Sequence, residues 1–145
     1  MVLALAVRVL VRIEIAGCEV ESVALVNSGF ETETPQILVP VKMLIENNID
    51  VSALKGSSVE YGTPAGNVSM YVVRRGCTIS VIEPDRVVGE VISDLVISPI
   101  EREVLISDAL GEELGIEILS LKRGFWRFRD DPPNTIRNSR RPQLW

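Results

Sequence analysis

The segment best suited to carry chemistry is Asn27-Ser28-Gly29, which directly follows the hydrophobic run Ala24-Leu25-Val26. Gly29 permits a tight loop, the Ser28 hydroxyl can hydrogen-bond the backbone, and Asn27 is expected to point away from the strand end. A side-chain amide cannot take a proton from water near neutral pH. By turn-residue preferences alone, such a triplet after a strand is more often a simple turn than a site.

Several other chemistries are excluded by composition. The chain has no histidine, which rules out Ser-His-Asp, Cys-His and HExxH zinc catalysis. Cys18 and Cys77 are far apart and form no C-x-x-C pair, which rules out a zinc ribbon or a disulfide framework. One disulfide between them is possible, but two unrelated free thiols fit a cytosolic chain better. Because the sequence has no ligand cluster, we expect neither a metal nor an organic cofactor.

The acidic residues offer one alternative acid. Asp108 follows Ser107 at the start of a predicted helix, where a carboxylate stabilises the helix dipole, and this structural role fits it better than catalysis. The pairs Glu112-Glu113 and Asp130-Asp131 are interpreted as solvated faces rather than metal sites. Trp126, with aromatic residues on both sides, is interpreted as part of the core or of a dimer interface.

The elements that position these residues are mostly strands. Residues 7–15 alternate apolar and polar side chains, and this period of two predicts a strand with one buried face. Ser107 is the predicted N-cap of a helix and Gly115 its left-handed end. Further strands are predicted at 20–26, 36–39, 58–61, 68–74, 77–83, 86–92, 95–97, 104–106, 116–119 and 125–128, a short helix is predicted from Pro40 to Asn47, and residues 62–67 are the predicted hairpin tip.

Length and charge indicate one domain with a distinct tail. A chain of 145 residues with 46% hydrophobic residues can bury one core, and its 5% of aromatic residues leaves Val, Ile and Leu to fill it. Residues 1–121 carry 8 basic and 18 acidic side chains, whereas residues 122–145 carry 7 basic and 2 acidic ones. Nucleic-acid binding is one interpretation of this tail. Pairing of Lys122, Arg123, Arg127 and Arg129 with carboxylates of the body or of a partner subunit is the favoured one.

The N-terminal residues predict a cytoplasmic protein. The apolar opening MVLALAV is interrupted by Arg8 and Arg12 before a membrane span could form, so no membrane contact is expected. The opening also lacks a basic leader and a small-residue cleavage site, so no signal peptide is expected.

Two segments resemble the retropepsin-like (clan AA) aspartic peptidases. The run A-L-V-N-S-G-F, followed by P-Q-I-L-V-P-V-K-M-L-I-E, is similar to the family's hydrophobic-hydrophobic-Asp-Thr/Ser-Gly loop, short strand and helix. The run V-L-I-S-D-A-L-G-E-E-L-G-I-E-I is similar to its second motif. The resemblance covers residues 7–128, and the tail R-G-F-W-R-F-R-D-D looks like that of prokaryotic, chiefly archaeal, members.

The resemblance implies a mostly β, retropepsin-like acid-protease barrel with one or two short helices at residues 1–129, followed by a basic tail at 130–145. It implies a homodimer in which two loops bring two carboxylates around one water, one carboxylate staying protonated. Asn27, Ser28 and Gly29 would occupy the catalytic positions. The hairpin would form a flap that closes over an extended peptide, and the expected substrate-binding residues are Phe30, Tyr61, Gly62, Thr63, Ala65 and Gly66.

Two residues depart from the family pattern. Ser107 replaces the glycine of the second motif and caps the helix instead. Asn27 replaces the catalytic aspartate, and a homodimer would lose both copies. The favoured interpretation is a non-catalytic relative that kept the peptide groove. An engineered inactive variant and deamidation of Asn27 to Asp are the others. A non-enzymatic β-barrel scaffold protein is the alternative function.

Overall fold

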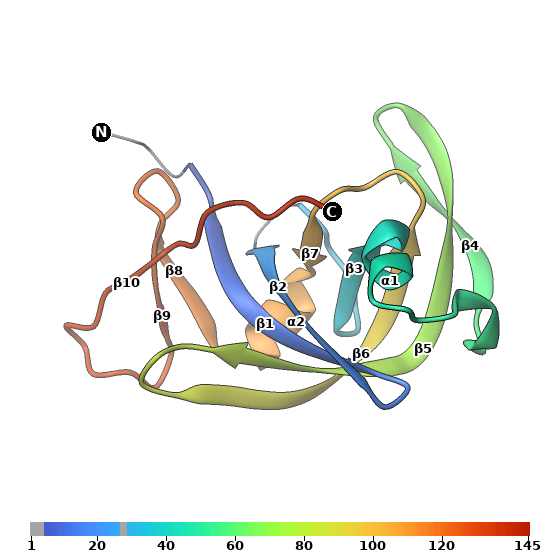
Figure 1. The fold of residues 1–145 in the computed structure, drawn as a ribbon. Helices are drawn as coiled ribbons and strands as arrows, with labels where there is room; N and C mark the ends of the chain where they lie inside the picture. Colours follow the sequence, from blue (N-terminus) through green and yellow to red (C-terminus); the bar gives the residue numbers. More distant parts are fainter. Residues whose placement is uncertain (1–4, 27–28) are drawn as a thin grey trace.

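Figure 1 shows the fold in the computed structural model, which describes residues 5–26 and 29–145. The elements in chain order are β1 (Val7–Ile15), β2 (Cys18–Val26), β3 (Gln36–Pro40), α1 (Val41–Glu46), the 3-10 turn η1 (Val51–Ala53), β4 (Ser57–Thr63), β5 (Gly66–Ile82), β6 (Val87–Ser98), β7 (Val104–Ile106), α2 (Asp108–Glu113), β8 (Ile116–Ser120), β9 (Phe125–Phe128) and β10 (Arg137–Asn138). The predicted mostly-β class with one or two short helices is confirmed, and the described residues contain two α-helices. No helix in the described residues is long and apolar enough to cross a membrane.

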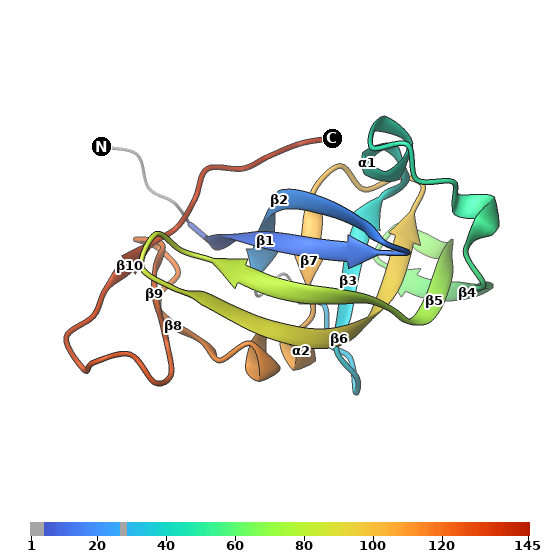
Figure 2. The ribbon, with the colours of Figure 1, turned by 60° about the horizontal axis from the view of Figure 1, so that its bottom comes forward.

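Within the described residues, six strands close into a barrel in the order β1-β2-β7-β3-β6-β5. Closure comes from the pairing of β5 with β1, and Figure 2 shows these two strands side by side. Strand β4 extends the sheet beyond β5 and so lies outside the closed ring. Strands β8, β9 and β10 form a second, smaller sheet.

The barrel interior follows from the alternation predicted for residues 7–15. Every second side chain of β1 is fully buried, from Val7 to Ile15, and the side chains between them are half-buried. A strand places successive side chains on opposite faces, so one face of β1 fills the core and the other lies outside the barrel. Burial of β-branched side chains from all six strands supplies the main stabilisation, at roughly 25 cal/mol per Å² of apolar surface.

Strands β5 and β6 are longer than the sequence predicts. Two breaks were expected, one near Arg75-Gly76 and one near Ser93-Asp94, but both strands run through. In β5 the register shifts between Val73 and Cys77, and Arg75 has a φ of 51°. A bulge thus absorbs the turn-forming residues without ending the strand.

The connection from β2 to β3 joins strands on either side of β7. Strand β7 lies between the other two: it pairs with β2 in parallel and with β3 in antiparallel orientation. Ile106 is in register with both Val26 and Ile37. Residues 29–35 accordingly lie where β7 ends and α2 begins, since Phe30 and Thr32 hydrogen-bond Asp108.

The C-terminal residues are packed against the barrel. Figure 1 shows the chain after β10 running back across β1 and β2. The Arg140 amide donates to the Arg8 carbonyl at 2.8 Å. The Val23 amide donates to Gln143 Oε1 at 2.9 Å, and Trp145 Nε1 donates to the buried Ser22 hydroxyl at 3.0 Å. The sequence predicted that this segment is ordered only if other residues bind it. These three hydrogen bonds bind it to the barrel.

Ion pairs fix the segment around β9 and β10. Arg127 pairs with Glu117 at 2.8 Å and Arg129 with Glu112 at 3.0 Å, which confirms for these two arginines that basic tail residues bind carboxylates of the body. The predicted solvated face at Asp130-Asp131 is wrong for Asp131. Its side chain is 3% exposed and accepts from Arg137 Nε at 2.9 Å. The Arg137 side chain is also buried, so the two charges pair away from water.

The aromatic side chains beside this network belong to the core. Trp126 and Phe128 are almost fully buried and meet edge to face, with ring centroids 5.0 Å apart. The Arg137 guanidinium lies 5.0 Å from the Phe128 ring centroid. Of the two interpretations of Trp126, the structure supports the core.

Candidate functional site

The loop after β2 holds the predicted catalytic triplet. Asn27 and Ser28 lie outside the described residues, and Gly29 is exposed with a φ of 79°. This left-handed backbone favours glycine, which agrees with the tight loop predicted there. Val26 on one side of the triplet is buried in register with Ile106, so the strand end that leads into the triplet is fixed by the barrel.

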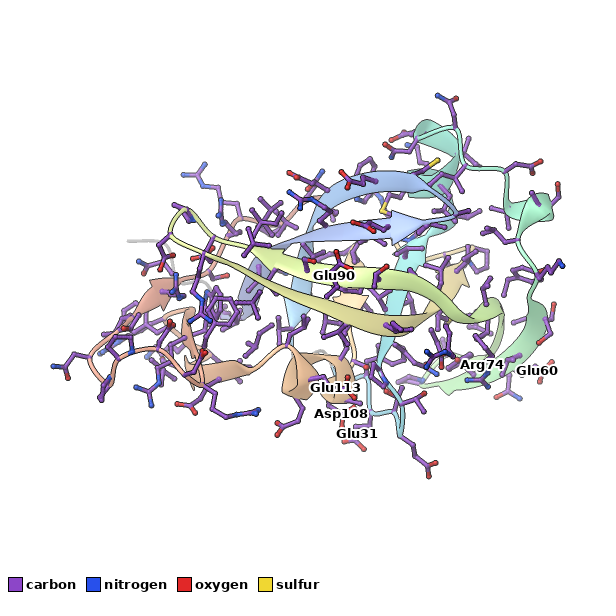
Figure 3. All side chains as sticks on the ribbon, turned by 90° about the horizontal axis from the view of Figure 1, so that it is seen from below. Glu31, Glu60, Arg74, Glu90, Asp108 and Glu113 are labelled. Atoms are coloured by element: carbon purple, nitrogen blue, oxygen red, sulfur yellow. The ribbon has the colours of Figure 1, made fainter. Side chains whose placement is uncertain are left out.

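The N-terminus of α2 holds the far side of this loop. The Asp108 amide donates to the Phe30 carbonyl at 3.0 Å, and Asp108 Oδ1 accepts from the Thr32 amide at 2.8 Å. Figure 3 shows Asp108 beside Glu31 of the loop. These contacts support the structural interpretation of Asp108, which joins the loop to the first turn of the helix.

Ser107 links the same helix to β3. Its hydroxyl accepts from the Leu110 amide at 3.2 Å, which confirms the predicted N-cap, and also from the Gln36 amide at 3.0 Å. The Ser107 amide in turn donates to the Gln36 carbonyl at 3.0 Å. Ser107 is fully buried, so these hydrogen bonds satisfy groups that water does not reach. Ser107, which stands where the resembled motif has glycine, thereby fixes the start of β3.

The predicted flap is the hairpin formed by β4 and the first part of β5. Its tip is tighter than the predicted 62–67, because Gly62 pairs with Asn67 and Thr63 with Gly66, leaving Pro64 and Ala65 as the turn. Gly66 has a φ of 111°, which favours glycine there. Four of the predicted substrate-binding residues, Gly62, Thr63, Ala65 and Gly66, are therefore at the far end of the hairpin.

Phe30 and Tyr61, the other two, belong to one apolar cluster outside the barrel. Its buried centre is Leu38, Met70, Val72 and Val96, with Phe30, Val59, Tyr61, Val68 and Leu105 packed around it. Neighbouring residues on the same strands, such as Ile37 and Leu95, fill the barrel interior instead. We call this set the outer cluster. It joins the loop after Gly29 to the inner side of the hairpin.

A buried carboxylate that sequence reasoning missed lies next to the outer cluster. The Asp94 side chain is 8% exposed, and its Oδ2 accepts from Thr34 Oγ1 at 3.0 Å and from Arg74 Nη1 at 3.1 Å. Gln36 Nε2 also donates to this oxygen at 3.3 Å. The sequence does contain a signal, since Asp94 lies between two apolar strand runs, but that signal was interpreted as a break between strands.

Electrostatics keep this carboxylate charged. Burial alone would raise the pKa of Asp94, but hydrogen bonds from the Arg75 amide, Thr34, Arg74 and Gln36 outweigh it and place the pKa below the usual range. The pKa of Tyr61 is raised, chiefly by burial, with Arg74 lowering it and Asp94 raising it. Near neutral pH, Asp94 is therefore an acceptor and Tyr61 a donor.

The two cysteines are not paired with each other. Cys18 is exposed, Cys77 is buried and both are free, so the two-thiol interpretation is confirmed and the disulfide is wrong. Burial raises the pKa of Cys77 to about 12, which makes its thiol a poor nucleophile. In residues 5–26 and 29–145, no group of three His, Cys, Asp or Glu side chains is arranged to hold a metal ion.

No sequence model of a known protein family matches the chain. No curated protein matches it in sequence either. The interpretation of the site therefore rests on its residues and their geometry.

Proposed function

We propose that the chain is a homologue of the retropepsin-like aspartic peptidases that binds extended peptide as a homodimer, and that Asn27 removes its hydrolytic activity. The observation that carries the proposal is the β2–β3 connection. In sequence, Asn-Ser-Gly follows barrel strand β2; Phe30 and Thr32 of the connection bind Asp108, and Ser107 fixes Gln36 at the start of β3. A rigid strand end followed by a braced polar loop is the type of support that a catalytic or binding group needs.

The chemistry follows from pairing two such loops. In an active relative, two Asp side chains would share one water, and one of them would stay protonated because like charges that close cannot both ionise. The charged carboxylate takes a proton from the water as the water attacks the peptide carbonyl. The protonated carboxyl transfers its own proton to the carbonyl oxygen. Two Asn side chains can do neither step, and general acid–base catalysis contributes about 10²–10⁴-fold in rate.

Peptide binding is supported by the hairpin and the outer cluster. Among the described residues, β4 pairs only with β5, so its other edge is open to an added strand. Tyr61 on β4 and Phe30 on the loop are both half-buried in the outer cluster, so each retains exposed apolar surface. We infer that an extended peptide lies between hairpin and loop, with its apolar side chains on these two rings.

Sedimentation equilibrium and peptide binding test this proposal together. We expect a particle of twice the 16.0 kDa chain mass, and peptides selected from a random library that bind it. Phe30→Ala should weaken their binding roughly tenfold, because a central aromatic contact usually contributes more than 1 kcal/mol. Ile45→Ala on α1 is the control, since Ile45 is 64% exposed and belongs to neither segment. A monomer, or equal affinity of both variants, would contradict the proposal.

A further inference from the structure

Asp94 lies at the joint between the hairpin and the barrel. Residues 77–82 of β5 form part of the barrel wall, whereas residues 66–72 pair with β4 in the hairpin, and Tyr71 and Val72 at its base also pair with β6. The bulge between Val73 and Cys77 separates the two parts. A Cβ atom on Gly76 would lie 2.7 to 2.8 Å from Val73 atoms, so the backbone of this bulge requires glycine at position 76.

Asp94 binds the bulge and the loop that leads into β3. Its Oδ1 accepts from the Arg75 amide at 2.8 Å and its Oδ2 from the Arg74 guanidinium at 3.1 Å, so it holds the bulge. The contact from Thr34 Oγ1 to the same Oδ2 adds the end of the loop that follows Gly29. One buried carboxylate therefore fastens β5 and the loop to β6.

Gln36 extends the connection to the other arm of the hairpin. It is 6% exposed, its Nε2 donates to Asp94, and its Oε1 accepts from the Tyr61 hydroxyl of β4 at 3.4 Å. Its backbone pairs with Ser107 through two hydrogen bonds, so Gln36 itself cannot move with the hairpin. Tyr61 of β4 and Arg74 of β5 thus contact two fixed side chains, those of Gln36 and Asp94.

We propose that Gln36 and Asp94 form a latch that holds the β4–β5 hairpin against the loop of residues 29–35 and sets how readily the hairpin opens. Tyr61 is the moving half of the latch, whereas Arg74, whose side chain is otherwise 67% exposed, binds Asp94 from the bulge. The link to peptide entry rests on the function proposed above, but the latch itself is a property of the free chain. Opening requires breaking the Tyr61 contact while the bulge, with Arg74 and Arg75, stays in place.

Hydrogen exchange of the free protein tests the latch. Tyr61→Phe removes only the hydroxyl, and Asp94→Asn removes the charge that Arg74 binds. In both variants we expect the exchange rate of the amides of residues 58–70 to rise roughly tenfold, which corresponds to the loss of one hydrogen bond. The exchange rate of β1 should equal that of the unmodified chain. Tyr71→Phe is the matched control, because the Tyr71 hydroxyl binds Leu54 and Gly56 instead. It should affect only residues 54–57.

Tyr61→Phe decides the outcome, because Asp94→Asn changes a buried group and can destabilise the whole barrel. The latch is overturned if hairpin exchange in Tyr61→Phe equals that of the unmodified chain. It is also overturned if exchange rises equally in the hairpin and in β1. Since no peptide is present, a failure of peptide binding leaves this result unaffected, and a failed latch leaves the proposed peptide binding to its own test.

Discussion

The Asn27→Asp variant is expected to hydrolyse peptides in acid at a rate at least 10²–10⁴-fold above that of the unmodified chain, because it restores a general acid and a general base at once. Activity should fall as the pH rises above about 5, the region where the second carboxyl of such a pair loses its proton. Cleavage of a peptide library between pH 3 and 7, followed by mass spectrometry, measures this effect.

Two controls separate this gain from other causes. Asn27→Ala should be as inactive as the unmodified chain, since it also lacks a carboxylate. Peptide mass mapping of the unmodified chain should find intact Asn27, which would exclude deamidation as a hidden source of aspartate. A soluble, dimeric Asn27→Asp protein that cleaves nothing over this pH range would contradict the proposed peptidase ancestry and favour a β-barrel interaction protein.

Arg137→Met is expected to lower the free energy of unfolding by roughly 3–5 kcal/mol, the usual cost of removing one partner from a buried ion pair. Arg137 binds Glu83, Asp85 and Asp131, and the side chains of Glu83 and Asp131 are only 9% and 3% exposed. Methionine preserves the length of the side chain but removes the cation that these two carboxylates share, which leaves, among the described residues, Glu83 with Arg140 alone and Asp131 with Arg86 alone. Urea unfolding near neutral pH gives the measurement.

The pH dependence of this loss distinguishes an ion-pair effect from a packing effect. Hydrogen bonds from Arg137 hold the pKa of Asp131 well below its usual range, against the opposing effect of burial. A depressed carboxyl pKa contributes stability above the unfolded pKa of about 4, and that contribution is lost as pH falls toward the folded value. The difference between Arg137→Met and the unmodified chain should therefore shrink between pH 5 and pH 2.

An exposed ion pair provides the matched control for Arg137. The side chains of Arg129 and Glu112 are 54% and 76% exposed, and such surface pairs contribute about 0–1 kcal/mol. Arg129→Met should therefore change stability little at any pH. If Arg137→Met costs no more than this control, the buried network does not hold the C-terminal segment on the barrel.

Local patterns predicted the elements that depend on neighbouring residues. The alternation in residues 7–15 predicted which face of β1 is buried, and the strand at 125–128 has the predicted bounds. Ser107 caps α2, and Gly115 has a φ of 73°, as expected for the left-handed end of a helix. In each case the responsible interaction lies within a few positions along the chain, where periodicity and capping preferences apply.

Features that depend on distant partners were not predicted. Asp94 was interpreted as part of a strand break because its partners, Gln36 and Thr34, are 58 and 60 residues away. Asp131 was interpreted as solvated, although Arg137 and the distant Arg86 bury it in an ion-pair network. A single sequence shows the charge of a residue but not which chain segment will lie against it. The family resemblance gave the place of the triplet, and its role stays a prediction.

The proposed function depends most on the position of residue 27 in a dimer, which cross-linking measures directly. In a Cys18→Ser, Asn27→Cys chain, Cys77 stays buried, so a short bismaleimide reports position 27. We predict that two chains join efficiently through this position, whereas the natural chain, with exposed Cys18, does not cross-link at the same reagent length. A protein that stays single-chain after complete labelling of position 27 would contradict the paired-loop site and, with it, the proposed function.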